Sequence, residues 1–238
     1  MKLSKRLETV ASMVTKGNRA ADVGCDHGFV PIFLVESGIS PLAVAADVRP
    51  GPLSRAKEHI KEHRLEEKIQ TRLSDGLANI KPGEADSLIM SGIGGILMMR
   101  LLQDEEHTAK SFKELILSPQ SELFDVRRYL VSNGYLIEYE HMLCDEGKYY
   151  FIFHVLVKKD EREWSEEEYR YGKDICKDDM KTFLAYLEKE ERQYEQIIEK
   201  MKQAPENDRA VQRIAQLHQD ITCLKKRRQL VYDCGCFA

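Results

Sequence analysis

Several features that often reveal a protein's class are scarce in this sequence of 238 residues. Its apolar runs fall well short of the roughly 18 residues that a membrane-spanning helix requires. The charged start, residues 1–7, is not followed by the apolar stretch that a secretory signal needs. The six cysteines form no Cys-x-x-Cys pair of the metal-binding type. These absences favour a cytoplasmic protein with reduced thiols and with neither a membrane nor a metal as partner.

A large excess of either charge is missing as well. Lysine and arginine number 36 and aspartate and glutamate 40, so the net charge is −4. Because a protein that binds nucleic acid through its overall charge is strongly basic, any such contact here must depend on local patches. The chain is long enough for one core of about 150 residues and an appendage.

What the sequence does contain is an alternation of strand and helix patterns over its first 159 residues. Such βα units predict a parallel sheet, and two final extended segments joined at Asp145–Gly147 predict a hairpin that adds an antiparallel edge strand. The seven strands match the Rossmann-like topology of class I methyltransferases. The predicted strands are 20–24, 41–48, 68–74, 85–91, 113–118, 135–143 and 149–159, and the predicted helices are 3–14, 29–37, 50–64, 95–106 and 121–132.

Composition changes abruptly after Lys159, where strand-type runs disappear and Glu, Lys, Gln and Arg become frequent. Two apolar series at spacings of three, four or seven predict two helices that pack antiparallel, coiled-coil-like, around a turn at Pro205–Asp208. The alternative is two helices packed separately on the main domain. The series are Tyr169, Cys176, Met180, Phe183, Leu187, Tyr194, Ile197 and Met201, and then Ala210, Ile214, Leu217, Ile221, Leu224 and Val231.

This change predicts two domains, an α/β domain of residues 1–159 and a helical hairpin of residues 160–238. We expect the first domain to fold without the second, because its strands and helices already form a complete set of layers. Tyr149 and Tyr150, at the start of the last strand, are interpreted as ordinary strand packing.

The stretch Asp22–Gly28 (DVGCDHG) follows the first predicted strand and precedes a helix. A glycine turn at this place brings backbone close to a ligand, and the helix start offers free N–H groups. Any parallel sheet can carry one such glycine, so the motif alone is weak. Asp26 stands where dinucleotide-binding folds have a second glycine. A carboxylate repels a pyrophosphate but attracts an ammonium group, which favours S-adenosylmethionine as the ligand.

Acidic residues end three successive predicted strands, at Asp22, Asp47 and Asp75. Asp47 is placed to accept hydrogen bonds from ribose hydroxyls, and Asp75 from an adenine amino group. Together the three predict a nucleoside pocket at the carboxyl edge of the sheet. The predicted cofactor-binding residues are Asp22, Gly24, Asp26, His27, Asp47, Val48, Asp75, Gly76, Ser91 and Gly92.

The loop after the fourth strand, Ser91–Gly95, is rich in glycine and lacks the Pro-Pro-aromatic segment common in enzymes that methylate exocyclic amines. A backbone that makes room for the base favours a ring nitrogen as the methyl acceptor. Such a nitrogen already carries a lone pair, so catalysis needs in-line placement and polar groups that tolerate the resulting cation, and no strong base.

Four segments carry a resemblance to a known family: Leu3–Leu7, Asp22–Gly28, Gly92–Gly95 and Leu117–Gln120. They resemble the bacterial tRNA (adenine-N(1))-methyltransferase family TrmK, which modifies position twenty-two of tRNA, and the helical appendage is similar too. The resemblance implies a class I fold, S-adenosylmethionine as cofactor and the D-arm of tRNA as substrate. The sequence departs from the family pattern at Ile93, Ser118 and Gln120.

Asp26 and His27 are the predicted catalytic residues, facing the methionine end of the cofactor and the target base. The alternative for His27 is that it only braces the loop. The predicted substrate contacts are Lys5, Arg6, Gly94, Gly95, Pro119, Gln120, Lys225, Lys226 and Arg227. Two other functions stay open: a small-molecule methyltransferase whose helical pair is a lid, and a non-catalytic tRNA-binding adaptor. A monomer is favoured.

Overall fold

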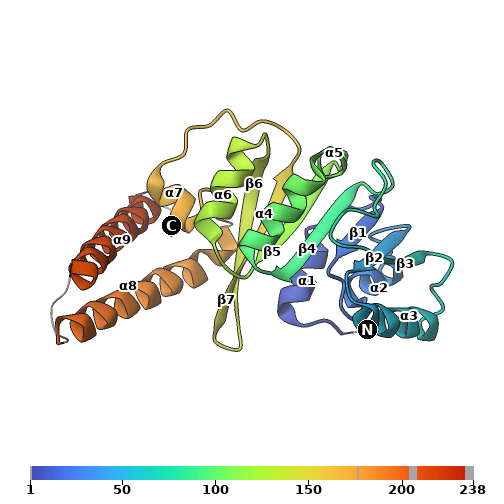
Figure 1. The fold of residues 1–238 in the computed structure, drawn as a ribbon, viewed down its shortest axis with the longest axis horizontal. Coiled ribbons are helices and arrows are strands. Elements are labelled where there is room, and N and C mark those ends of the chain that lie inside the picture. Colours follow the sequence, from blue (N-terminus) through green and yellow to red (C-terminus); the bar gives the residue numbers. More distant parts are fainter. Residues whose placement is uncertain (1, 176, 204–207, 234–238) are drawn as a thin grey trace.

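The computed structural model describes residues 2–175, 177–203 and 208–233. A twisted sheet with helices on both faces forms one end of the molecule, and a pair of long helices forms the other (Figure 1). Residues 205–207 of the predicted turn lie outside the described residues, as do Cys176, Cys234 and Cys236.

The sheet has seven strands in the order β3-β2-β1-β4-β5-β7-β6, which confirms the predicted class I methyltransferase fold. β1 to β5 are parallel and β7 is antiparallel to both of its neighbours. The strands are β1 (Ala20–Val23), β2 (Ala43–Asp47), β3 (Ile69–Leu73), β4 (Ser87–Ile93), β5 (Glu114–Pro119), β6 (Leu136–Asp145) and β7 (Lys148–Leu156). The helices are α1 (Lys5–Ser12), α2 (Phe29–Glu36), α3 (Pro50–Glu62), α4 (Gly95–Asp104), α5 (Glu106–Ala109), α6 (Leu123–Ser132), α7 (Glu166–Tyr171), α8 (Met180–Lys202) and α9 (Asp208–Asp233), with a 3-10 turn η1 (Lys177–Asp179).

β7 lies one position inside the edge of the sheet, which corrects the prediction of an antiparallel edge strand. Residues 151–155 of β7 are all buried, as an interior strand requires, whereas β6 alternates buried and accessible positions. Chain order misled the prediction, because the second strand of the hairpin folds back between its partner and β5. The composition of the two strands carried the right signal, since only β7 has a continuous apolar run.

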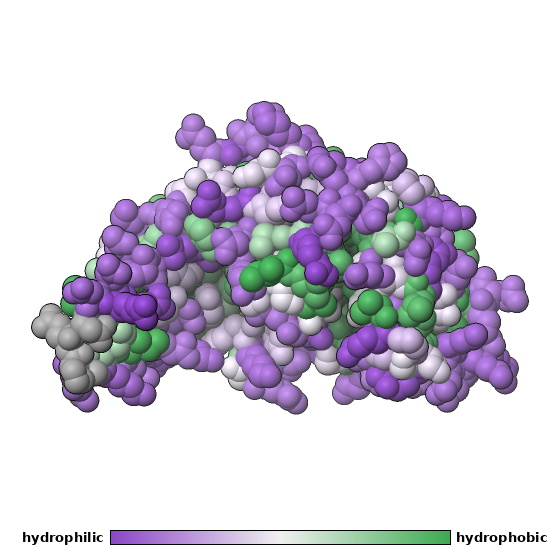
Figure 2. Space-filling view, viewed as in Figure 1, coloured by the Kyte–Doolittle hydropathy of each residue, from purple (hydrophilic) through white to green (hydrophobic). Residues whose placement is uncertain are grey.

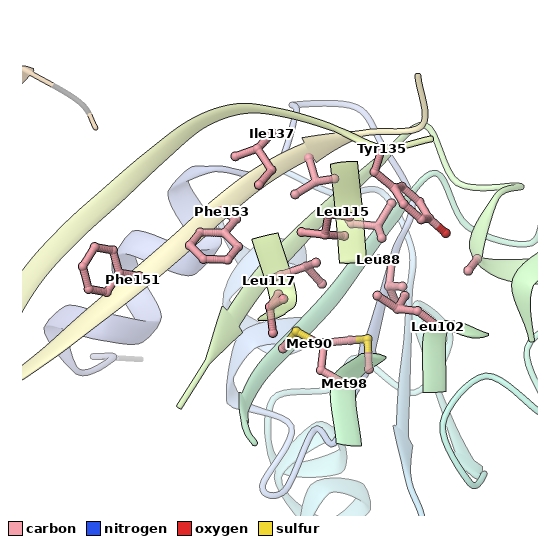
Figure 3. Packing of buried hydrophobic residues seen from close by; sticks show 14 of the residues in the cluster. Leu88, Met90, Met98, Leu102, Leu115, Leu117, Tyr135, Ile137, Phe151 and Phe153 are labelled. Carbon is pink, nitrogen blue, oxygen red and sulfur yellow. The ribbon is translucent and has the colours of Figure 1, made fainter. Parts of the chain in front are cut away.

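The two faces of the sheet have separate cores. On one face α1, α2 and α3 cover residues such as Ile89 and Ile116, and on the other α4 and α6 cover Leu88, Leu115 and Leu117. Figure 3 shows the second core, where the side chains of Met98 and Leu102 from α4 lie against Leu88 and Met90 of β4. These cores hold the strand ends, and therefore the site built on them, in fixed positions.

α8 and α9 run antiparallel, as predicted. The carboxylate of Glu191 on α8 accepts from Arg228 near the far end of α9 at 2.7 Å, while Ile198 packs with Leu217 and Ile221 nearer the turn. The first apolar series is not one helix, because α7 ends before Gly172, whose φ of +91° leaves the helical region. Tyr169 thus belongs to α7 and packs on Trp164, not in the α8–α9 seam.

A buried ion pair joins the sheet to α7. Arg127 on α6 and Glu140 on β6 are both fully buried and approach to 2.7 Å, and the Arg127 guanidinium also donates to the carbonyls of Tyr169 and Arg170 at 3.1 and 2.9 Å. A Cβ on Gly172 would lie 3.0 Å from both Glu140 carboxylate oxygens. Residues from α7, α8 and α9 also share one apolar cluster with the sheet. The packing therefore crosses the predicted boundary at Lys159.

Candidate active site

A cavity of about 560 Å³ opens at the carboxyl ends of β1, β2 and β4. Its wall is formed by the turn between β1 and α2, by the end of β2, by the loop after β3 and by the end of β4. All of the predicted cofactor-binding residues, from Asp22 to Gly92, line this one cavity. The tertiary structure thus brings together the strand ends that the sequence marked separately.

The turn between β1 and α2 gives Asp26 an unusual backbone conformation. Its φ is +46°, in the left-handed region, so an aspartate occupies a position where glycine has no steric cost. Gly28 follows as the N-cap of α2, also left-handed, and a Cβ there would lie 3.1 Å from that of Ala56. Of the four described non-glycine residues with positive φ, Asp26 is the one that lines the cavity, and aspartate tolerates this conformation better than most residues.

Two buried carboxylates, those of Asp22 and Asp47, lie on the wall of the cavity, each only 4% exposed. Burial and the nearby charge of Asp47 raise the pKa of Asp22 to about 7, although Arg6 acts in the opposite direction. Asp47 accepts from the backbone N–H of Arg49 at 2.9 Å and from that of Asp26 at 3.3 Å. Like charges held together in this way favour a ligand that carries positive charge and hydrogen-bond donors.

Asp26 and His27 lie at the mouth of the cavity and contact each other. The distance from His27 Nε2 to Asp26 Oδ2 is 3.5 Å, and Arg55 approaches the other Asp26 oxygen at 3.4 Å. The His27 ring stacks on Phe29 and on His59, with centroids 5.2 and 5.7 Å away. The stack braces His27, and its Nδ1 is buried with no hydrogen-bond partner among the described residues.

α1 places Arg6 over the cavity. Arg6 Nη1 donates to Ser91 Oγ at 2.5 Å, and the guanidinium lies 5.5 Å from the centre of the Tyr150 ring. Arg6 and Gln120 are the predicted substrate contacts that line the cavity, whereas Lys5 is an exposed residue in the first turn of α1. Pro119 lies outside it and lines a neighbouring cavity.

The glycines of the Ser91–Gly95 loop have different roles. Gly92 lines the cavity, and a Cβ added to it would lie 3.6 Å from the side chains of both Arg6 and Gln120. Gly95 is buried, and a Cβ there would meet the carbonyl oxygen of Ser121 at 2.5 Å, so the close packing of the start of α4 against the segment between β5 and α6 requires glycine. Gly94 faces Ser121 Oγ at 3.3 Å. Of these three glycines only Gly92 lines the cavity, so Gly94 and Gly95, which were also predicted as substrate contacts, lie outside its lining.

The basic run near the end of α9 lines neither this cavity nor the neighbouring one. Lys225 pairs with Glu191 at 3.1 Å and Lys226 with Glu167 at 3.4 Å, with side chains still 53% and 66% exposed. Arg227 is only 8% exposed and donates to the Lys173 carbonyl at 2.9 Å. This burial is at odds with the predicted substrate contact at Arg227, which instead holds α9 against the segment that follows α7.

Sequence analysis missed the apolar part of the wall. Phe29 and Val30 come from the first turn of α2, and Leu97 and Leu101 come from α4. The sequence offered a signal for these residues, because each of the two helices directly follows a strand end that lines the cavity. These side chains suit the flat, largely apolar faces of a nucleoside.

The described residues contain neither a membrane-spanning helix nor a cluster of metal ligands. No helix in this part of the chain combines the length and apolarity that a membrane span needs. Within residues 2–175, 177–203 and 208–233, no group of three His, Cys, Asp or Glu side chains is placed to hold a metal ion.

A family model described as a methyltransferase domain matches residues 3–153, and the chain belongs to this family. The chain is 28% identical over 232 residues to the tRNA (adenine(22)-N(1))-methyltransferase of Bacillus subtilis, covering 95% of this chain and 97% of that protein.

Solved structures agree with this relationship. The crystal structure of the B. subtilis m1A22 tRNA methyltransferase TrmK has a TM-score of 0.80 at 27% identity, covering 95% of this chain and 98% of that one. A Streptococcus pneumoniae protein crystallised with S-adenosyl-L-methionine has a TM-score of 0.84 at 31% identity, covering 95% and 99%. The comparisons confirm the resemblance to TrmK drawn from the four sequence segments, and the likeness extends through the C-terminal helices.

Proposed function

We propose that the protein is a tRNA methyltransferase that transfers a methyl group from S-adenosylmethionine to N1 of an adenine. The observation that carries the proposal is the cavity at the carboxyl ends of β1, β2 and β4, whose acidic wall belongs to a methyltransferase domain. The adenine is assigned to position 22 of tRNA, the position in the name of the B. subtilis relative that matches 95% of this chain.

The residues of the cavity fit S-adenosylmethionine better than a phosphate-bearing cofactor. Asp22, Asp26 and Asp47 would repel a pyrophosphate, whereas an ammonium group relieves the repulsion between Asp22 and Asp47. Asp47 at the end of β2 would accept from the ribose hydroxyls. When bound, S-adenosylmethionine supplies a methyl group on a positively charged sulfur.

The remaining residues of the site are assigned to the RNA base. Arg6 and Gln120 line the side of the cavity next to Gly92, where the backbone leaves room for a flat ring. N1 of adenine carries a lone pair and loses no proton before it takes the methyl group, so the chain needs only to orient the ring. Asp26 and His27, at the mouth, are assigned to the cation that the methylated base becomes.

The test is incubation of the protein and methyl-labelled S-adenosylmethionine with an unmodified tRNA transcript, followed by nucleoside mass spectrometry. We expect label in 1-methyladenosine, and none when the target adenine is replaced by 1-deazaadenine, which lacks N1. Label in small molecules of a cell extract, with none in RNA, would favour the small-molecule enzyme. Tight tRNA binding without any transfer would favour the non-catalytic adaptor.

A further inference from the structure

A second cavity, of about 440 Å³, lies between the β6–β7 hairpin and α8. In Figure 1 the tip of this hairpin projects beyond the sheet on the same side as α8, and Figure 2 shows mostly hydrophilic side chains along this lower edge of the molecule. The cavity is thus built jointly by the sheet domain and the helical pair. Its lining includes Gln120, Lys148, Tyr149, Tyr150, Tyr186 and Lys189.

Aromatic rings and ammonium groups meet in this cavity. The rings of Tyr149 on β7 and Tyr186 on α8 have centroids 5.4 Å apart, and both side chains are half-buried. Lys189 Nζ lies 5.0 Å from the centre of the Tyr149 ring and 3.2 Å from the carbonyl oxygen of Gly147. Lys148, at the hairpin tip, is exposed. Strand packing alone does not explain why tyrosine rings and lysine ammonium groups together line a cavity.

The second cavity shares a wall with the first. Gln120, directly after β5, lines both. Arg6 lines the first cavity, and its guanidinium lies 5.5 Å from the ring of Tyr150, which lines the second. A chain of nucleotides whose target base enters the first cavity beside Gln120 would therefore have a neighbouring nucleotide at the second.

We propose that the second cavity binds the nucleotide that flanks the target adenine in the RNA substrate. Its base stacks on the tyrosine rings, and its phosphate is bound by Lys148 and Lys189. Every base has a face that stacks on an aromatic ring, and lysines neutralise phosphates. This proposal rests on the proposed function, and it gives α8 a direct part in substrate binding.

One acidic residue, Glu190, also lines the cavity. Burial raises the pKa of this carboxyl, and the Tyr194 hydroxyl donates to it at 3.0 Å. Glu190 therefore repels a phosphate less than an exposed carboxylate would. The tyrosines and the two lysines set the character of the cavity, and they favour a nucleotide over a peptide.

The first experiment compares variants of the full chain. Tyr149→Leu removes the stacking face and Tyr149→Phe keeps it, while Lys148→Gln and Lys189→Gln each remove one phosphate contact. Lys68→Gln, at the start of β3 and on the opposite edge of the sheet, is the matched lysine control. The readouts are kcat/KM for tRNA methylation, tRNA affinity by gel shift at two salt concentrations, and S-adenosylmethionine affinity by calorimetry.

We expect Tyr149→Leu to weaken tRNA binding about tenfold or more, and Tyr149→Phe to behave like the wild type. Each Lys→Gln variant should make the salt dependence of binding shallower by about 0.7 in log–log slope, the amount expected for one phosphate of a single strand. Cofactor affinity should stay unchanged throughout. Should Tyr149→Leu fail to fold, the exposed Lys148 still carries the test.

The second experiment removes the base instead of the protein ring. In two RNAs, the nucleotide on either the 5′ or the 3′ side of the target is made abasic. One of these RNAs should lose about tenfold in wild-type affinity, and Tyr149→Leu should add no further loss with that RNA. If Tyr149→Leu weakens binding of both abasic RNAs as much as it weakens binding of the intact RNA, the proposal is overturned.

The two proposals fail in distinguishable ways. If the wild-type protein puts no label into tRNA, the proposed function is wrong. If it labels tRNA but the cavity variants behave like Lys68→Gln, the function stands and the second cavity is not a nucleotide site.

Discussion

Buried acids lie in two regions of this molecule, and their surroundings differ sharply. At the cofactor cavity, Asp22 and Asp47 are each 4% exposed and lie close enough for the charge of Asp47 to raise the pKa of Asp22. Elsewhere in the sheet, away from the cavity, Glu140 is fully buried against Arg127. Glu114, 3% exposed, accepts from Thr15, Ser87 and His154 at distances of 2.5 to 3.0 Å.

The difference separates acids that hold the fold from acids kept for a ligand. Hydrogen bonds from its partners lower the pKa of Glu114 to about 2 despite burial, while burial and a like charge raise that of Asp22 to about 7. A positive charge relieves repulsion only where buried acids are crowded together, so we expect a cationic ligand at Asp22 and Asp47 and none at Glu114.

Removing residues 160–238 should have the largest effect, because it takes away partners of the buried acids and of the sheet core. Truncation deletes the α7 carbonyls that accept from Arg127 and the apolar side chains that α7, α8 and α9 add to the sheet core. We expect the free energy of unfolding to fall by more than about 5 kcal/mol, measured in urea, which approaches the whole stability of a typical domain. A truncated protein that unfolds like the full chain would instead support the expectation that residues 1–159 fold without the helices.

Arg127→Met tests one ion pair in the same region. It leaves the Glu140 carboxylate buried without its cation, which should cost about 3–5 kcal/mol of stability. The control is Arg128→Met, at the exposed neighbouring position on α6. Adding Glu140→Leu to Arg127→Met should recover much of the loss, and a double variant no more stable than the single one would contradict this explanation.

Acid should remove the contribution of Glu114. Its pKa is about 2 in the folded protein and about 4.3 when unfolded, so the unfolded state takes up the proton first as the pH falls. The stabilisation, up to about 3 kcal/mol, is complete above pH 4.5 and disappears by about pH 2. Chemical denaturation at pH 7 and pH 3 should therefore show this contribution of Glu114, read as the difference between wild type and Glu114→Gln, reduced to about half at the lower pH.

Asp47→Ala tests whether the crowded acids of the cavity bind the cofactor. Loss of hydrogen bonds to a charged group should weaken S-adenosylmethionine binding by about 1.5–3 kcal/mol. Calorimetry measures this affinity, and Asp104→Ala, at an exposed position at the end of α4 that does not line the cavity, is the control. An unchanged affinity in Asp47→Ala would remove Asp47 from the cofactor site.

The smallest expected effect concerns Asp22 in the protein without ligand. Because its folded pKa of about 7 lies above the unfolded value, its ionisation makes folding less favourable as the pH rises from about 4 to above 7. Asp22→Asn should therefore stabilise the free protein at pH 8 by about 1 kcal/mol, since water in the open cavity relieves part of the burial cost. Thermal melts at pH 5 and pH 8 should show the gain only at the higher pH.

Local pattern alone predicted most of the elements. The apolar strands and the turn residues between them marked β1 to β5 correctly, because these signals act over a few residues. The start of α8 was misplaced, because the apolar spacing continues through Gly172 while the backbone there, at φ +91°, leaves the helix. The role of Gly95 was missed because it depends on the carbonyl of Ser121, which the chain brings near only when folded.

The sequence by itself determined the class of fold, the acids at the ends of β1 and β2 and their convergence on one cavity, since parallel strands must end at the same edge. Only the tertiary structure decided which polar side chains are buried and paired within the protein. It turned Arg127 and Glu140 into a buried pair and Arg227 into a packing residue, and it set α8 beside the β6–β7 hairpin to enclose a second cavity. Such choices depend on distances between residues far apart in the chain, and no local pattern records them.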